Sequence, residues 1–182
     1  EFYTKVVTYS MYEVGVQWEK GIISVAQEHL ATSIVMRIMA NLYMKLNVFY
    51  DTRGKAIVVA PQNEFHEVGA RIIADLLEFD GWDVSYLGSN VFNDDLISIL
   101  KKEIPDVLVI SVTMAYNLVT IMELIAKIRN DSQISNIRIV IGGNAFKEGL
   151  NSDELMDADF IAKSTDDTIK VTREWWGEIY GY

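Results

Sequence analysis

From residue 55 onward, short continuous hydrophobic runs alternate with amphipathic segments. The runs are rich in β-branched residues, which favour strands, while the segments between them repeat their apolar positions at helical spacing. Near-continuous apolar strands separated by helices are typical of a parallel sheet that is covered on both faces. We therefore expect five strands, at residues 56–60, 83–87, 107–111, 137–141 and 160–162.

The amphipathic segments predict the helices that cover this sheet. Successive strand–helix units of this length predict a flavodoxin-like, doubly wound α/β fold, in which ligands bind at the carboxyl ends of the strands. The expected helices lie near residues 67–80, 93–103, 117–130 and 146–156, with a closing helix near 165–178.

The first 50 residues have a different pattern, with apolar positions at helical spacing and no proline. We expect a helix over about residues 2–15, a break near Gly15 to Gly21, and a long helix over about residues 21–46. Two helices cannot bury all their apolar faces, so they must pack on other helices, on the rest of the chain or on another subunit. We therefore divide the chain into a helical cap at residues 1–50, part of a four-helix bundle, and an α/β domain at residues 51–182.

Composition excludes several classes of function. The net charge of −10 argues against nucleic-acid binding, which needs clustered lysine and arginine. The chain has no cysteine, so disulfides, thiolate metal sites, iron–sulfur clusters and cysteine catalysis are excluded.

From the sequence we expect neither a membrane span nor a signal peptide. No apolar run reaches the roughly 20 residues of a membrane span, and no basic segment followed by an apolar one opens the chain as in a signal peptide. We expect a cytoplasmic protein that does not contact a membrane. The chain begins at Glu1 without a methionine, which suggests a piece of a longer protein.

Three motifs follow strands of the predicted sheet. The first is Glu64-Phe65-His66-Glu67-Val68-Gly69, and 41 residues separate it from Ser111-Val112-Thr113. A further 28 residues separate Thr113 from Gly142-Gly143. Each motif alone is weak, because a single histidine, a pair of hydroxyls or a glycine pair often has only a structural role. Carboxyl ends of parallel strands meet at one edge of a sheet, so we expect all three motifs to lie there.

In this order and spacing, the motifs resemble the Asp-x-His-x-x-Gly … Ser-x-Leu/Thr … Gly-Gly signature of cobalamin-binding domains. The resemblance implies that His66 is the lower axial ligand of cobalt and displaces the cofactor's own nucleotide base. Glu64 stands where aspartate is usual; it would bind the other ring nitrogen of His66 and fix its tautomer. Gly69 would let the bulky ligand approach the backbone.

The same resemblance implies a groove for the displaced nucleotide tail. Ser111 and Thr113 would line the groove and contact the base, and Gly142 and Gly143 would form a floor without side chains. We expect Gly88, which follows the second strand, at the same edge.

A further pattern lies in the helical region, where nine residues separate Trp18 from Glu28-His29. This Trp-x9-Glu-His arrangement resembles the helical cap of MerR-type light-responsive repressors and related photosensors, which bind adenosylcobalamin. There the tryptophan shields the adenosyl group, and Glu28 and His29 would shape its pocket. Glu19 departs from the pattern, since the repressors carry a histidine after the tryptophan.

From these resemblances we expect a cobalamin-binding sensory domain without enzymatic activity. It would hold adenosylcobalamin, or methylcobalamin, and act as a light-responsive switch on oligomerisation or on an attached output module, for example in transcription regulation. The alternative is a corrinoid carrier that shuttles methyl groups between methyltransferases; such carriers usually continue the first motif with Lys-Asn, where this chain has Ala70-Arg71. A third alternative, the cobalamin subunit of a mutase, does not need the helical cap.

Overall fold

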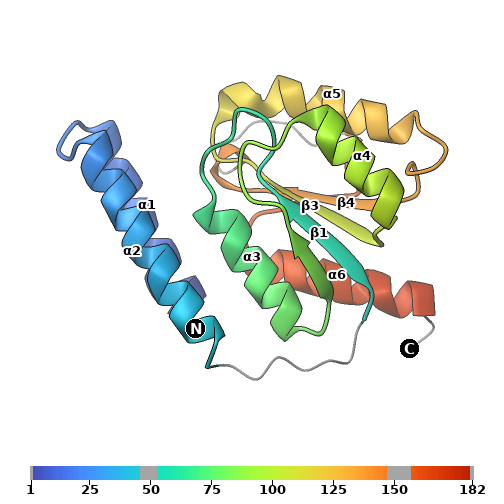
Figure 1. Cartoon of the computed structure of the whole chain (residues 1–182), viewed down its shortest axis with the longest axis horizontal. Helices are drawn as coiled ribbons and strands as arrows, with labels where there is room; N and C mark the ends of the chain where they lie inside the picture. Colours follow the sequence, from blue (N-terminus) through green and yellow to red (C-terminus); the bar gives the residue numbers. More distant parts are fainter. Residues whose placement is uncertain (1, 46–52, 147–156, 181–182) are drawn as a thin grey trace. The chain divides into compact units, whose positions relative to one another are not determined.

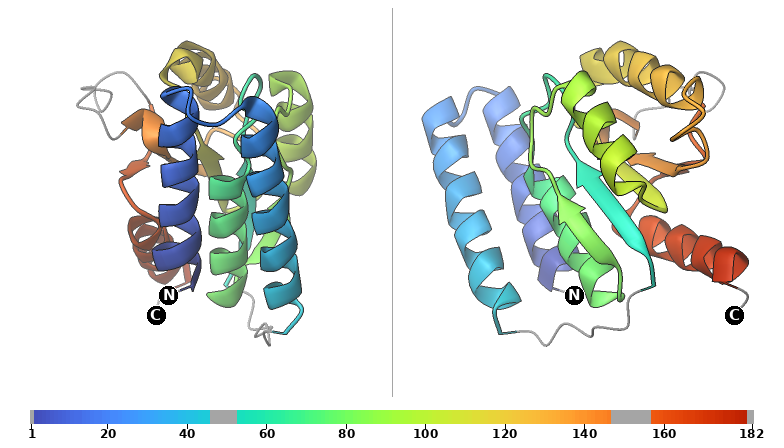
Figure 2. Two further views of the ribbon diagram at one scale, coloured as in Figure 1. Left: turned by 90° about the vertical axis from the view of Figure 1, so that its left-hand side faces the viewer. Right: turned by 45° about the vertical axis from the view of Figure 1, so that its right-hand side comes forward.

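The computed structural model describes residues 2–45, 53–146 and 157–180, which fall into two compact units, Glu1–Val48 and Phe49–Tyr182 (Figure 1). The first unit is a helical hairpin. It consists of a π-helix η1 (Phe2–Val7), a helix α1 (Thr8–Glu19) and a helix α2 (Val25–Tyr43), with α1 and α2 side by side (Figure 2).

The break between the two helices lies later than the sequence predicts. Gly15 stays inside α1, because a helix tolerates one glycine at a cost of about 1 kcal/mol. The turn comes at Gly21, whose φ of +69° lies in the left-handed region. Ser24 then starts α2 with a capping box, accepting a hydrogen bond from the amide of Gln27 and donating its own amide to the Gln27 side chain.

The second unit contains the predicted parallel sheet. Its strands are β1 (Lys55–Val59), β2 (Asp83–Tyr86), β3 (Val107–Ser111), β4 (Arg138–Gly142) and β5 (Phe160–Ala162). All neighbours are parallel, in the order β2-β1-β3-β4-β5. This order confirms the flavodoxin-like, doubly wound fold, and each strand lies within one residue of its expected bounds.

Helices cover both faces of the sheet, as Figures 1 and 2 show. Helices α3 (Val68–Phe79) and α6 (Thr165–Tyr180) lie on one face, and α4 (Asn93–Glu103) and α5 (Leu118–Arg129) on the other. The helix expected near residues 146–156 lies outside the described residues, apart from Phe146, which ends a short 3₁₀ turn. None of the described helices combines the length and hydrophobicity of a membrane span.

The core forms two layers, because side chains alternate across each strand. In β1, Ile57 and Val59 belong to the layer under α4 and α5, whereas Ala56 and Val58 belong to the layer under α3 and α6. All four are at most 2% exposed. A strand buried on both faces holds the loop that follows it in a fixed position, which matters for the polar residues after β1.

Candidate functional site

The polar residues after β1 lie where the strand order reverses. Strands β1 and β3 are neighbours in the sheet, but their helices α3 and α5 leave toward opposite faces. In sheets of this kind, the usual ligand site lies at the carboxyl ends of the two strands between which the order reverses. Glu64 and His66 occupy the β1–α3 loop at this point.

Glu64 is the centre of a hydrogen-bond network that joins the two loops. Its side chain is fully buried. One oxygen, Oε2, accepts hydrogen bonds from the backbone amides of Thr113 (2.9 Å) and Met114 (3.0 Å) in the loop after β3. The other oxygen, Oε1, lies 3.2 Å from the amide of His66 and 2.5 Å from its ring atom Nδ1.

These bonds set the charge of Glu64. Burial raises the pKa of the carboxyl, but the hydrogen bonds from the His66 ring and from the amides of Met114, Thr113 and His66 outweigh it and lower the pKa to about 2. Glu64 is therefore a carboxylate at neutral pH, and it can accept a hydrogen bond from a protonated Nδ1 of His66. The Glu64 side chain, one methylene longer than that of aspartate, contacts both the β1–α3 loop and the loop after β3.

His66 is held by this carboxylate and remains partly open to solvent. Its side chain is 43% exposed, whereas that of Glu64 is 0% exposed. With the proton on Nδ1, the atom Nε2 carries the lone pair that a metal ion binds, and the carboxylate increases its basicity. An oriented imidazole at the carboxyl edge of the sheet is, in its neutral form, suited to axial ligation of a metal.

Asn117 is a further member of the network that the sequence analysis missed. Its Nδ2 donates to Oε2 of Glu64 (3.1 Å) and to the backbone carbonyl of Asn63 (3.2 Å), and the residue is only 2% exposed. An asparagine directly before a helix normally indicates a helix cap. Here its side chain makes no cap hydrogen bond to α5 and instead ties the β3–α5 loop to the β1–α3 loop. Only its position after the Ser-x-Thr motif could have indicated this role.

The structure brings the other two motifs to the same edge. Gly142 pairs with Ser111 at the end of the sheet, and a Cβ on Gly69 would lie 3.4 Å from the Ser111 hydroxyl. The amide of Thr113 contacts Glu64, so this residue helps to hold the carboxylate through its backbone. The three motifs therefore line one continuous strip, as the sequence analysis expects of strand ends.

Different structural features favour glycine at Gly143 and at Gly88. Gly143 has a φ of +117°, and a Cβ there would lie 2.2 Å from the carbonyl oxygen of Val112. The close approach of the β3 loop therefore requires glycine whatever ligand binds. Gly88 has a φ of +82° but open space around it, and its carbonyl accepts a hydrogen bond from Ala60 after β1. Gly88 thus lies at the same edge, as predicted.

These residues fit a corrinoid better than a metal ion bound by protein side chains alone. Among the described residues, no group of three or more histidine, aspartate or glutamate side chains could hold a metal ion. A corrinoid brings its own equatorial nitrogens and needs only one axial ligand, which His66 can supply.

In the helical hairpin, Trp18, Glu28 and His29 lie at the end where the two helices are joined. Trp18 is near the end of α1 and is 37% exposed. Glu28 accepts a hydrogen bond from Thr32 (2.8 Å), and its other oxygen lies 3.6 Å from Nε2 of His29. The turn thus brings the three residues to one end of the hairpin, and their proposed contact with a cofactor stays a prediction.

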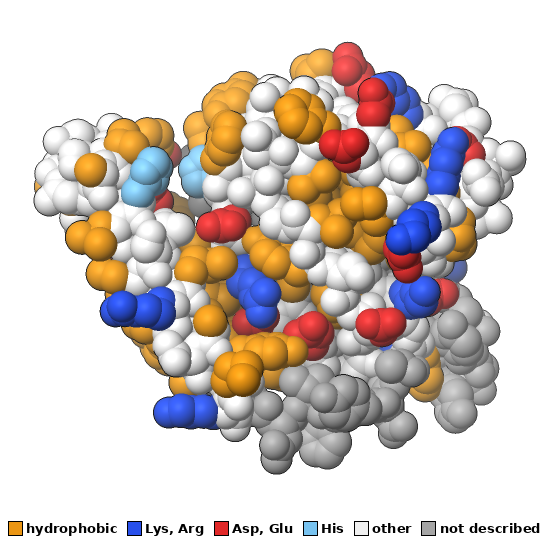
Figure 3. Space-filling model, in the orientation of Figure 1, with side chains coloured by type: hydrophobic (Ala, Val, Ile, Leu, Met, Phe, Trp, Pro, Cys, Tyr) orange, Lys and Arg blue, Asp and Glu red, His pale blue; other side chains and the backbone are white. Residues whose placement is uncertain are grey.

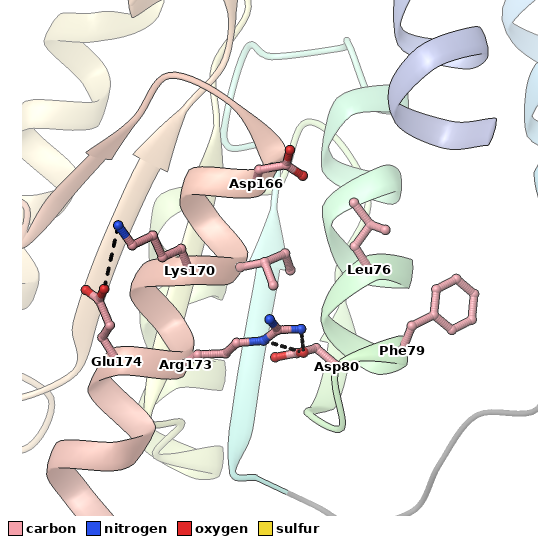
Figure 4. A pocket seen from close by; sticks show the side chains of 8 residues that line it. Leu76, Phe79, Asp80, Asp166, Lys170, Arg173 and Glu174 are labelled. Atoms are coloured by element: carbon pink, nitrogen blue, oxygen red, sulfur yellow. Dashed lines mark hydrogen bonds and ion pairs between the residues drawn. The ribbon is translucent and has the colours of Figure 1, made fainter. Parts of the chain in front are cut away.

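A groove of about 540 Å³ between α3 and α6 contains none of the predicted site residues. Figure 4 shows Arg173 of α6 donating to the carboxylate of Asp80 beside Phe79 and Leu76, with Lys170 paired to Glu174. Phe79 and Asp80 lie at the opposite end of α3 from His66. The groove is therefore separate from the strand ends that carry the three motifs.

Comparison with known families gives two matches. The sequence model of a family described as "B12 binding domain" matches residues 54–170, and a second model with the same description matches residues 1–43. The first match covers the sheet, helices α3, α4 and α5, the start of α6 and all three motifs.

Individual relatives are more distant. The chain is 22% identical over 165 residues to trimethylamine corrinoid protein 2 of Methanosarcina acetivorans, covering 89% of this chain and 75% of the relative. The monomethylamine corrinoid protein of Methanosarcina barkeri is similar in fold, with a TM-score of 0.77, 22% identity, and coverage of 90% of this chain and 77% of that one. The methanol:cobalamin methyltransferase complex of the same organism is also similar in fold, with a TM-score of 0.57 and 18% identity. This match covers 92% of this chain and 63% of that one.

Proposed function

Because the chain belongs to the B12 binding domain family, we propose that it carries a corrinoid on His66 and passes methyl groups between methyltransferase partners. The observation that carries this proposal is the buried Glu64 carboxylate, which holds Nδ1 of His66 at 2.5 Å at the carboxyl edge of the sheet. When bound, the corrinoid would supply cobalt chemistry that accepts and releases a methyl group.

The protein's part in this function is ligation, orientation and shielding. His66 would bind cobalt through Nε2, and Glu64 would keep the ring in one tautomer and one orientation. Asn117, with the amides of Thr113 and Met114, keeps the carboxylate in place. The path of the nucleotide tail would be lined by Ser111, Thr113, Gly142 and Gly143. Gly69 and Gly88 would lie beside it.

The relatives favour the carrier hypothesis over the light-sensor hypothesis. Two of the three relatives described above are named as methylamine corrinoid proteins and the third as a methyltransferase complex. The sensor hypothesis depends on Trp18, Glu28 and His29, and Glu19 departs from the photosensor pattern. In a carrier, the same three residues would cover the upper face of methylcobalamin and limit the access of water to it. Adenosylcobalamin, an attached output module and light-driven assembly are features of the sensor hypothesis only.

Methyl transfer itself tests the proposal. The corrinoid-loaded chain would be reduced and mixed with purified methyltransferases of the source organism, each with methanol or a methylated amine as donor. We expect one pair of enzyme and donor to convert the spectrum to that of the methylated corrinoid, with one methyl group per chain. A chain that binds corrinoid but is methylated by no pair, and that changes its assembly in light, would support the sensor instead.

A further inference from the structure

A second, polar pocket opens beside the His66 loop, on the face of the sheet that α4 and α5 cover. It has a volume of about 430 Å³ and lies between the β1–α3 loop, the start of α4 and one face of α5. Asn63 lines the pocket, and its backbone carbonyl accepts a hydrogen bond from Nδ2 of Asn117. The same Nδ2 also donates to Glu64. The pocket is therefore one residue away from the network that holds His66.

The lining of this pocket has more carboxylates than cationic groups, and it contains a buried acceptor without a partner within the described part of the chain. Asn93, the first residue of α4, is only 8% exposed, and its Oδ1 has no hydrogen-bond partner within the described part of the chain. Asp94 and Glu123 add two carboxylates, against the single ammonium group of Lys127. A buried carbonyl oxygen without a donor is costly, so this position indicates a missing donor group.

The existing ion pair in the pocket is weak enough to be exchanged. Lys127 Nζ lies 3.5 Å from Asp94 Oδ1, and the two side chains are 56% and 91% exposed. Exposed pairs of this kind contribute little to stability. An incoming cation could therefore replace Lys127 as the partner of Asp94 at a small cost in free energy.

One exposed aromatic side chain lines this pocket, and two more exposed apolar side chains lie at the start of α5. Phe92 lines the pocket and is 57% exposed. Tyr116, in the turn before α5, is 69% exposed, and Val119, the second residue of α5, is 66% exposed. Val119 lies one turn before Glu123 on α5, so the two share a face of that helix. Figure 3 shows hydrophobic and acidic side chains next to one another over the start of α4. Aromatic groups around a polar pocket are typical of protein interfaces.

The charge of the whole unit agrees with a cationic partner. Residues 1–48 contain four basic and four acidic side chains, so the net charge of −10 belongs entirely to residues 49–182. A metal ion is a poor occupant, because no described cluster has the three acidic or histidine ligands to hold one. A guanidinium fits better, since its planar fork can donate to a carboxylate and to a carbonyl oxygen together.

We propose that this pocket receives an arginine side chain of the methyltransferase that docks on the carboxyl edge of the sheet. The inference rests on the proposed carrier function for the identity of the partner. The arginine would donate to Asn93 Oδ1 and to the carboxylates of Asp94 and Glu123, and its neighbours would pack on Phe92 and Val119. Docking here would bring the partner next to the loop that positions His66.

The test is a nuclear magnetic resonance titration of the ¹⁵N-labelled, cobalamin-loaded chain with N-acetyl-arginine amide. The matched ligand is N-acetyl-citrulline amide, which has nearly the same shape without the charge. We expect arginine to shift the side-chain amide signal of Asn93 and the backbone signals of Asp94 and Thr120. Citrulline should bind roughly tenfold more weakly, because it lacks the charge-assisted hydrogen bonds. Equal effects of the two ligands, or no shifts at these residues, would overturn the proposal.

Two charge reversals complete the test. Glu123→Lys should abolish the arginine shifts and slow methylation of the loaded chain by its methyltransferase, while Asp95→Lys should do neither. Asp95 is the control because it is exposed on α4, next to Asp94, but does not line the pocket. If Glu123→Lys instead weakens cobalamin loading and Asp95→Lys does not, the pocket belongs to the corrinoid and the proposal is wrong. If the chain takes up no cobalamin, and the same arginine shifts appear in the cobalamin-free chain, the proposed function fails on its own.

Discussion

The carboxylate of Glu64 lies 2.5 Å from Nδ1 of His66, and the same carboxylate accepts two backbone amides from the loop after β3. The histidine is therefore positioned by the neighbouring strand as well as by its own loop. Because β1 and β3 are both buried in the sheet, small movements of the surface cannot easily shift the ring. This link between two strand ends is the structural basis of the predictions below.

Acidification should remove the contribution of Glu64 to stability. Its pKa falls from the ordinary 4.5 to about 2 on folding, so the carboxylate stabilises the folded state fully above about pH 4.5. This contribution, roughly 3 kcal/mol at most, is lost as the pH falls from 4.5 to 2. Urea unfolding of the wild type and Glu64→Gln at several pH values should give a difference in unfolding free energy that shrinks over this range. A difference that stays constant would contradict the low pKa.

Asn117→Ala should weaken both folding and corrinoid binding. The change leaves Oε2 of Glu64 and the carbonyl of Asn63 each without one donor, at a cost of about 1–3 kcal/mol. Because Glu64 would then hold His66 less firmly, corrinoid affinity should fall by roughly 10- to 100-fold. Urea unfolding and spectral titration with hydroxocobalamin measure the two effects.

The control for this variant is Asn130→Ala at the far end of α5. Asn130 also donates its side-chain amide to a backbone carbonyl, that of Ala126, but it is exposed and far from Glu64. We expect its corrinoid affinity to equal that of the wild type. Equal losses of affinity in the two variants would mean that Asn117 acts only through general stability.

Gly143→Ala should destabilise the α/β unit far more than Gly88→Ala. At Gly143 the added Cβ would lie 2.2 Å from the Val112 carbonyl oxygen, and both the clash and the positive φ add cost, together roughly 3 kcal/mol or more. At Gly88 the positive φ is strained but the space is open, which predicts about 1–2 kcal/mol. Thermal unfolding of the two variants should show this order. The reverse order would contradict the described approach of the two loops.

Light should not change the assembly of a methyl carrier. We expect methylcobalamin bound to the chain to photolyse under green light with a change of spectrum but no change of mass in size-exclusion chromatography with light scattering. A change of mass that disappears in His29→Gln would favour the sensor, because His29 is the residue of the helical hairpin that could capture cobalt after photolysis.

The sequence predicts the α/β unit well because its strands are buried on both faces. Apolar runs such as Val107 to Ile110 have no other stable position, and the helices between them carry clear amphipathic patterns. The helical hairpin is harder to predict, since glycines at 15 and 21 are both possible breaks. Only the left-handed φ of Gly21 distinguishes them.

The candidate site is predicted in part. The resemblance identifies Glu64 and His66, but it does not give the partners of the second carboxylate oxygen. Those partners are two backbone amides and Asn117, which no side-chain pattern reveals until the β1 and β3 loops are placed together. The polar pocket beside Asn93 escapes the sequence for the same reason, because three separate segments form it.

The most direct test of the account is the electron paramagnetic resonance spectrum of the cobalamin-loaded chain in the Co(II) state. One axial ¹⁴N ligand splits each cobalt line into a triplet, whether that nitrogen belongs to the protein or to the cofactor's own base. With ¹⁵N-labelled histidine, we predict a doublet for the wild type and for His29→Gln, and no doublet for His66→Ala. A triplet that survives the labelling would mean that cobalt keeps its own base, and it would contradict the assignment of His66 as the axial ligand.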